Sequence, residues 1–267
     1  MRKLYTFAFL LILVPSVASA WGAYTKQVDV FGITIIATDS VADEKLLHAA
    51  NVMAAYLDNN QDGKADDLRV IDAMVSRHAY LFMSGGEFEQ LVAPWPNEDF
   101  RKAEEFGQNL FADEAHPDGS SIERGFDATL EEVLHLVSHV GYANTYPKQF
   151  GEQVGSELAN AMDGARGGRF MEAPSVYPEN AWYTYDDKTC DYGCMATEYF
   201  YWALTSLLGA QSYTGREDEI KHEWRLSSAR KVELTDGKIY NLLSILSIKV
   251  IPTGEYTGGL LTIKPIN

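Results

Sequence analysis

The sequence predicts a single α+β domain that is rich in helix, and three observations lead to this prediction. Apolar residues recur at helical spacing over most of the chain, one stretch near the amino terminus is rich in β-branched residues, and no internal repeat or low-complexity linker divides the chain. Hydrophobic residues make up 46% of the sequence, which is enough for one sizeable core. We therefore expect residues 21–267 to form one domain with a small sheet and a larger helical part.

The expected elements follow from local patterns. Residues 28–38 (VDVFGITIIAT) are β-branched and predict a strand, and 78–86 predict a second strand that ends at a glycine turn. Residues 87–125 are polar and contain prolines, so short helices and loops are expected there. Apolar periodicity predicts helices at 42–57, 68–77, 127–140, 151–164, 195–208 and 215–227, followed by a tail helix at 238–246 and a closing strand or hairpin at 247–258.

The first twenty residues have the pattern of a secretory signal peptide. Arg2 and Lys3 precede an apolar run, and the small residues at 18–20 predict cleavage before Trp21. The run is shorter than the roughly 20 residues of a membrane-spanning helix, and no later stretch is apolar enough to span. We therefore expect a protein without a membrane span that is secreted or periplasmic.

The net charge of −16 excludes some partners. A surface this acidic repels nucleic acid and anionic membranes, so neither is expected to bind. Divalent cations remain compatible with such a surface. The sequence gives no indication of the oligomeric state.

Two cysteines occur in the segment TCDYGCMA, as Cys190 and Cys194. In an exported protein, a close pair predicts a disulfide, and free thiols are the alternative. A loop this small removes little chain entropy, so the bond is expected to fix the backbone locally.

The segment LDNNQDGKADD fits a calcium-loop pattern, D-x-N-x-D-G. In the loop 58–69 the expected oxygen ligands are the side chains of Asp58, Asn60, Asp62 and Asp66 and the backbone carbonyl of Lys64. Gly63 permits the sharp turn at the sixth position, and helices are expected on both sides. The alternative is a polar turn without a cation.

The loop resembles an EF-hand, except that Arg69 stands at the twelfth position, where an EF-hand has a bidentate glutamate. It is also similar to the calcium repeats of dockerin and thrombospondin type. Asp67 or a distant carboxylate would then complete the shell. In an exported protein, the calcium ion is expected to brace the structure.

The segment TLEEVLHLVSHVGYA places two acids and two histidines on one predicted helix. At about 100° per residue, Glu131, Glu132, His135 and His139 fall within an arc of about 100°. An exposed salt-bridged stripe would explain four ionisable side chains, but it should contain lysine or arginine, and none occurs from Ala128 to Tyr146. The pattern therefore favours a transition-metal site in the region 127–208.

This helix resembles the helix of zincin metallopeptidases, which carries the motif H-E-x-x-H. Two alignments are possible. In the first, EEVLH matches, with Glu131 and His135 as ligands and Glu132 as general base. In the second, HLVSH matches, with His135 and His139 as ligands, and Glu132 acts from the preceding turn.

Gluzincins, a branch of that group, take a third ligand from a glutamate on a later helix. The resemblance implies Glu198, which lies in the apolar segment ATEYFYWALTSLL, where an unpaired carboxylate would be costly. Glu157 is the alternative, with Asp163 as a partner for a histidine. The cysteine pair would fix the start of the helix that carries Glu198.

The resemblance implies an exported, calcium-binding, metal-dependent hydrolase that uses Zn²⁺ at His135, His139 and Glu198, with Glu132 as the catalytic base and a peptide or protein as substrate. The alternative is a non-enzymatic extracellular or periplasmic module that binds calcium and a second metal.

Overall fold

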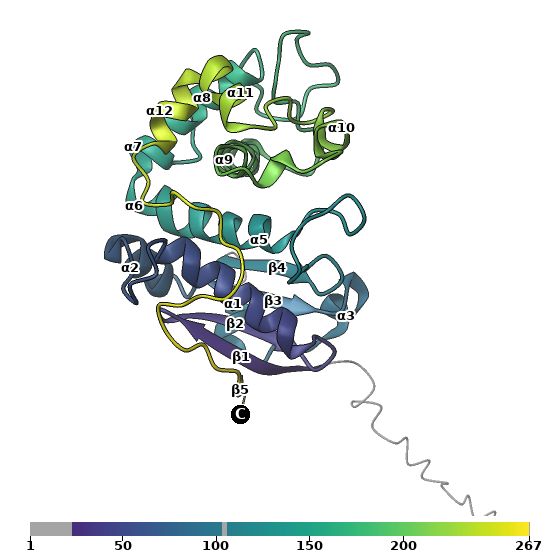
Figure 1. Ribbon diagram of the computed structural model, residues 1–267, viewed down its shortest axis with the longest axis vertical. Helices are drawn as coiled ribbons and strands as arrows, with labels where there is room; N and C mark the ends of the chain where they lie inside the picture. Colours follow the sequence, from purple (N-terminus) through teal and green to yellow (C-terminus); the bar gives the residue numbers. More distant parts are fainter. Residues whose placement is uncertain (1–22, 103–105, 267) are drawn as a thin grey trace, which may run out of the picture.

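The structure, a computed structural model, describes residues 23–102 and 106–266. The predicted signal peptide lies outside these residues. The expected fold class is confirmed: the described chain is a helix-rich α+β domain with one small sheet (Figure 1). Within the described residues, every helix is too short or too polar to cross a membrane.

The sheet has five strands in the order β4-β3-β2-β1-β5. Strand β1 pairs antiparallel with both β2 and β5, whereas β3 pairs parallel with β2 and with β4. The strands are β1 (Tyr24–Val30), β2 (Ile33–Thr38), β3 (Tyr80–Ser84), β4 (Gly107–Phe111) and β5 (Lys264–Pro265). Strand β4 therefore forms one end of the sheet.

The expected single strand at 28–38 is in fact a hairpin. The chain turns at Phe31 and Gly32, which both have positive φ (53° and 87°). Two successive residues of positive φ match the twist of a two-residue hairpin, and glycine adopts this conformation without strain. The single strand was wrong because the β-branched residues continue on both sides of the turn.

The two faces of the sheet are covered unequally. One face, which includes Ile35 and Leu81, joins the main core beneath α1 (Asp43–Leu57) and α5 (Thr129–Leu136). The other face carries Tyr80 and forms a small aromatic cluster with Trp95, beside α3 (Glu87–Val92) and α4 (Glu98–Lys102). This alternation follows from the two-residue period of a strand.

The remaining helices lie mostly beyond α5, on the side away from β1 (Figure 1). Helix α9 stands above α5, and α8, α11 and α12 pack beside it. The remaining helical elements are α2 (Leu68–Ser76), the π-helix η2 (Val137–Tyr142), α6 (Ala143–Thr145), α7 (Pro147–Phe150), α8 (Glu157–Ala165), α9 (Tyr192–Leu207), the 3₁₀ helix η3 (Ala210–Ser212), α10 (Arg216–Ile220), α11 (Ala229–Thr235) and α12 (Gly237–Leu243).

Several boundaries differ from the expected ones. The helix expected at 151–164 begins only at Glu157, where Ser156 caps it, and the helix expected at 215–227 ends at Ile220. The tail has no strand at 247–258, and its short strand β5 comes later, against β1. Strand β4 and helix α11 were not expected.

Candidate metal centre

Helix α5 is held against the core by its apolar face and by an anchored start. Leu130, Val133 and Leu134 are buried beneath it. At its start, the carboxylate of Asp127 accepts hydrogen bonds from the backbone N–H groups of His116 (2.9 Å) and Thr129 (3.2 Å). The side chains that leave the opposite face of α5 are therefore fixed in place.

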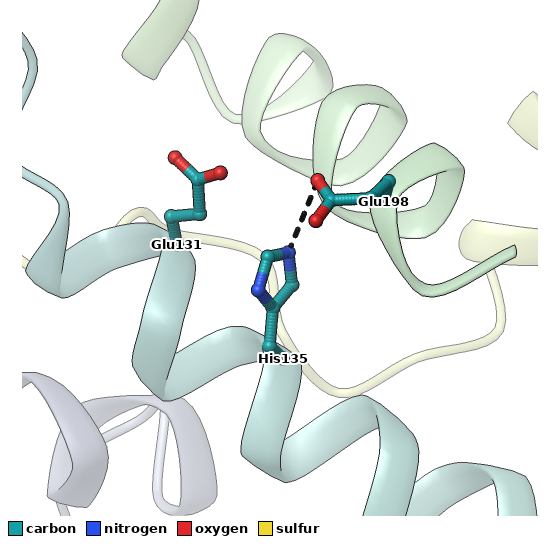
Figure 2. A group of neighbouring side chains, drawn as sticks. All are labelled: Glu131, His135 and Glu198. Carbon is teal, nitrogen blue, oxygen red and sulfur yellow. Dashed lines mark ion pairs between the residues drawn. The ribbon is translucent and has the colours of Figure 1, made fainter. Parts of the chain in front are cut away.

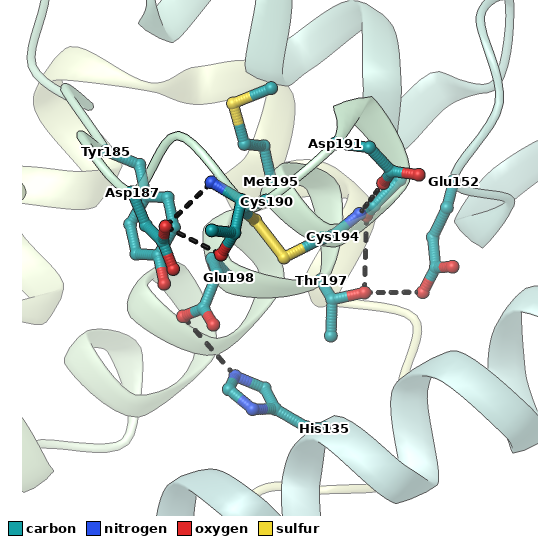
Figure 3. The surroundings of a disulfide bond; sticks show 12 residues. His135, Glu152, Tyr185, Asp187, Cys190, Asp191, Cys194, Met195, Thr197 and Glu198 are labelled. Carbon is teal, nitrogen blue, oxygen red and sulfur yellow. Dashed lines mark hydrogen bonds and ion pairs between the residues drawn. A yellow bond between two sulfur atoms is a disulfide. The ribbon is translucent and has the colours of Figure 1, made fainter. Parts of the chain in front are cut away.

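Helix α9 is also fixed at its start. The side chain of Asp191 caps it by accepting from the backbone N–H of Cys194 (2.9 Å). The predicted disulfide between Cys190 and Cys194 is confirmed, with Cα atoms 5.3 Å apart. Figure 3 shows this bond directly before the turn that carries Glu198, so the disulfide fixes the backbone that positions the glutamate.

Three side chains from these helices converge. One potential ligand atom from each of Glu131, His135 and Glu198 lies within 4.8 Å of the others. Figure 2 shows Glu131 and His135 leaving α5 toward Glu198 on α9. Nε2 of His135 lies 3.4 Å from Oε2 of Glu198, yet this buried nitrogen has no hydrogen-bond partner among the described residues. A bound water molecule or ion is one way in which such a buried polar atom is satisfied.

Charges are crowded at this point. Burial, and then the negative charge of Glu198, raise the pKa of Glu131 to about 8. Burial lowers the pKa of His135, but the charges of Glu198 and Glu132 outweigh it and leave this pKa well above its ordinary value. Carboxylates this close repel one another unless a cation or a proton lies between them. The protein without a metal therefore retains protons where a cation would fit.

Glu132 lies on the other side of the His135 ring. Its Oε2 is 3.5 Å from Nδ1 of His135 and accepts a hydrogen bond from the side-chain amide of Gln108 on β4. Nε2 of His135 is thus left to face Glu131 and Glu198. A carboxylate at the second nitrogen of a metal-binding histidine orients the ring.

His139 lies outside the group formed by Glu131, His135 and Glu198. Its ring is 49% exposed, and Nδ1 lies 2.7 Å from Oε2 of Glu152. The α-helix widens into the π-helix η2 from Val137, so the side chain four residues after His135 no longer projects from the same face. The hydrogen bond to Glu152 raises the pKa of His139.

The alternative third ligand also lies elsewhere. Glu157 is exposed at the first turn of α8. Asp163 bonds to Arg169 (2.8 Å) and to the hydroxyl of Tyr192 (3.0 Å), so its carboxylate is used in other contacts.

Two tyrosines outside the predicted ligand set border the group. The ring of Tyr201 on α9 meets the ring of His135 edge to face, with centroids 5.4 Å apart. Tyr185 lies beside Glu198 (Figure 3), and its pKa is raised by burial and then by the charge of Glu198. The aromatic and acidic composition of 182–192 was the available signal for Tyr185.

The loop 58–69 is ordered by its own side chains and by the carboxy-terminal tail. Asp58 is fully buried and accepts from the backbone N–H of Gly63 (2.8 Å) and from the hydroxyl of Tyr256. Asn60 and Asp62 accept from backbone N–H groups within the loop, and Asp66 accepts from that of Asn59. Among the described residues, only Glu131, His135 and Glu198 form a group of three acidic, histidine or cysteine side chains whose ligand atoms lie within 4.8 Å of one another. The carboxylates of the loop are therefore more widely spaced than these three.

Comparison of the chain with protein-family models, with curated protein sequences and with solved structures finds no match. The assignment of a function therefore rests on the residues of this chain.

Proposed function

We propose that this protein is a metal-dependent hydrolase whose substrate is a peptide or protein. The convergence of Glu131, His135 and Glu198 carries the proposal. Catalytic zinc sites in proteins have three ligands of the imidazole and carboxylate type and one open position. The three side chains here supply one imidazole and two carboxylates, which is the ligand chemistry such a site requires.

The distance between the potential ligand atoms also fits a zinc ion. Two atoms that each lie about 2.0–2.1 Å from a tetrahedral zinc ion are about 3.3 Å apart. The separation between Nε2 of His135 and Oε2 of Glu198 is 3.4 Å, which is close to this value. When bound, zinc would supply a Lewis acid that polarises a carbonyl and lowers the pKa of water.

The surrounding side chains would accept a proton, donate a hydrogen bond and orient the His135 ring. Glu132 is proposed to accept a proton from the attacking water. Its contact with Nδ1 of His135 also orients that ring. The amide of Gln108 holds the carboxylate of Glu132 from β4. The phenol of Tyr185 beside Glu198 would donate a hydrogen bond to an oxygen that gains negative charge.

A peptide is favoured over other carbonyl compounds because of β4. This strand forms the end of the sheet, and its Gln108 contacts Glu132. Extended peptides pair with free strand edges, so a peptide lying along β4 would pass beside the proposed proton acceptor.

The test is hydrolysis of a mixed peptide library by the zinc-loaded protein, read by mass spectrometry. Glu132→Gln preserves a hydrogen-bond acceptor for Nδ1 of His135 but removes the proton acceptor. The variant is expected to retain zinc and to lose activity by a factor of about 10²–10⁴. If the zinc-loaded wild type cleaves no peptide, the proposal is wrong, and the protein is a non-enzymatic metal-binding module.

We also propose that calcium binds the loop 58–69 through Asp58, Asn60, Asp62, Asp66 and the carbonyl of Lys64. Support comes from the D-x-N-x-D-G sequence and from the buried carboxylate of Asp58. Binding would draw the loop carboxylates together and brace the tail through Tyr256.

A further inference from the structure

The side chain of Tyr201, on α9, borders the candidate metal centre and is fully buried. Its ring meets the ring of His135 edge to face, with centroids 5.4 Å apart. Its hydroxyl is hydrogen-bonded to the carboxylate of Glu131. Burial is the main cause that raises the pKa of Glu131, and the hydrogen bond from Tyr201 acts in the opposite direction. Tyr201 therefore contacts two of the three proposed metal ligands without being a ligand itself.

A buried glutamine in η3 donates to the same hydroxyl. Nε2 of Gln211 lies 3.1 Å from the hydroxyl oxygen of Tyr201 and 3.0 Å from Oγ1 of Thr205. Gln211 is fully buried, so both N–H groups of its amide are used inside the protein. Because the phenol of Tyr201 accepts one of these bonds, its single proton remains to be donated, and the carboxylate of Glu131 accepts it.

The direction of these bonds depends on Arg216, at the start of α10. Nε of Arg216 donates to Oε1 of Gln211 over 2.7 Å. A guanidinium group has only donors, so the amide oxygen of Gln211 must face Arg216, and the amide nitrogen must face Tyr201. With the amide reversed, the phenol of Tyr201 would donate to the glutamine oxygen, and Glu131 would lose its donor.

Arg216 is itself held in place by its surroundings. Its side chain is buried, and its guanidinium group lies over the ring of Phe126, 4.4 Å from the centroid. The ring of Trp202 is 5.6 Å away, and Oε2 of Glu219 lies 3.4 Å from Nη1. Aromatic faces and a carboxylate stabilise a guanidinium charge that is removed from water. The Nε–H group of Arg216 is therefore held in one direction.

We propose that three side chains outside the ligand set form a positioning chain for the zinc ligand Glu131. The positioning chain consists of Arg216, Gln211 and Tyr201, each of which fixes the direction of the next hydrogen bond. Hydrogen-bond partners of a metal ligand orient it and contribute to metal affinity. A purely structural role, in which these side chains only tie α10 to α9, would affect stability and leave zinc affinity unchanged. The inference rests on the proposed metal centre and does not depend on peptide hydrolysis.

The test is the zinc Kd of chelator-treated protein, measured by competition with a chromophoric chelator. Tyr201→Phe keeps the ring but removes the donor to Glu131, and it is expected to raise the Kd by about 10- to 100-fold. Gln211→Glu has the same length but offers only acceptors to the phenol, so the phenol proton turns away from Glu131 and the Kd should also rise. The added negative charge alone would lower the Kd, so a higher value is not a charge effect.

A double variant and a matched control separate positioning from general loosening of α9. In the Tyr201→Phe protein, Gln211→Glu should cause no further rise in the Kd, because the positioning chain is already broken. The control is Tyr199→Phe, since this buried tyrosine lies on the same helix and donates its hydroxyl to the carboxylate of Asp236. Melting curves should show that the control is destabilised, whereas its zinc Kd should equal that of the wild type.

The outcomes separate the positioning chain from the proposed function. If the wild type binds zinc and Tyr201→Phe binds it equally tightly, the positioning chain is wrong and the metal centre stands. An equal rise of the Kd in Tyr199→Phe, or a double variant whose rise is the product of the two single rises, would also overturn it. If the wild type binds no zinc, the metal centre and the positioning chain fail together. Zinc binding without peptide hydrolysis would remove only the peptidase function.

Discussion

Nδ1 of His139 lies 2.7 Å from a carboxylate oxygen of Glu152, while Nε2 of His135, one helical turn earlier, faces Glu198. Two histidines four residues apart normally project from one face of a helix. The π-helix that begins at Val137 separates them here. Of the two alignments with the zincin motif, the structure therefore brings together the ligands of the first.

Replacement of His139 tests whether this side chain is a metal ligand or only a partner of Glu152. His139→Ala is expected to keep the zinc stoichiometry of the wild type, since the side chain pairs with Glu152. Loss of a half-exposed ion pair should lower the free energy of unfolding by only about 0.2–1 kcal/mol. Metal analysis by mass spectrometry checks the first point. A zinc-free His139→Ala protein alongside a zinc-loaded His135→Ala protein would contradict it.

The disulfide should contribute modestly to stability. The chain-entropy relation for a loop of five residues gives about 2 kcal/mol at 25 °C. The variant Cys190→Ala/Cys194→Ala is expected to lose this amount in denaturant unfolding. A reductant should lower the free energy of unfolding of the wild type by a similar amount. The same reductant should leave the variant unchanged, so the variant serves as the control. If the reductant also lowered the free energy of unfolding of the variant, the effect of the reductant would not come from this disulfide.

Asp127 predicts a stability change at acid pH. Burial raises the pKa of this carboxyl, but the bonds from His48 and from the backbone of His116 outweigh it, so folding lowers the pKa. The folded state then binds fewer protons than the unfolded state. The contribution of Asp127 is therefore complete above the ordinary carboxyl pKa of about 3.9, and it is lost as the pH falls below that value.

The matching variant is Asp127→Asn. It is expected to lower the free energy of unfolding by about 1–3 kcal/mol at pH 7, because buried hydrogen-bond partners lose a charged acceptor. The difference from the wild type should shrink as the pH falls from 5 to 2. Asp72→Asn, at an exposed position, is the control. A difference that stays constant with pH would show that the carboxylate charge is not the cause.

Calcium is expected to stabilise the protein through the loop 58–69. Added to chelator-treated protein, calcium should raise the melting temperature, with a gain of about 2.7 kcal/mol at a free concentration one hundred times the Kd. Asp58→Asn should abolish this response, whereas Glu198→Gln should keep it, since the loop and the candidate metal centre are separate. An unchanged melting temperature in the wild type would rule out the calcium site.

Much of the fold could be predicted from local patterns. Helix α1 follows from its apolar spacing and its acidic first turn, and β3 follows from a short apolar run before two glycines. Strand β4 could not be predicted in this way, because Gly107 and Asn109 are poor strand formers. Its pairing with β3 decides its conformation, and that pairing is a tertiary contact.

The candidate site was only partly predictable for a similar reason. The apolar neighbours of Glu198 indicated that its carboxylate would be buried near a partner. The π-helix at Val137 has no marker in the sequence, so the expectation that His139 faces the same way as His135 followed from ideal helix geometry. The approach of Tyr185 to Glu198 depends on how the irregular segment before α9 folds back against that helix.

The central claim is that Glu131, His135 and Glu198 together hold one zinc ion. Crystals of zinc-loaded protein, measured on both sides of the zinc absorption edge, test it most directly. The account predicts one anomalous peak about 2.0–2.2 Å from Nε2 of His135 and from a carboxylate oxygen of each glutamate, with a fourth position open to solvent. A peak bound to His139 and Glu152, or no peak among the three side chains, would contradict it.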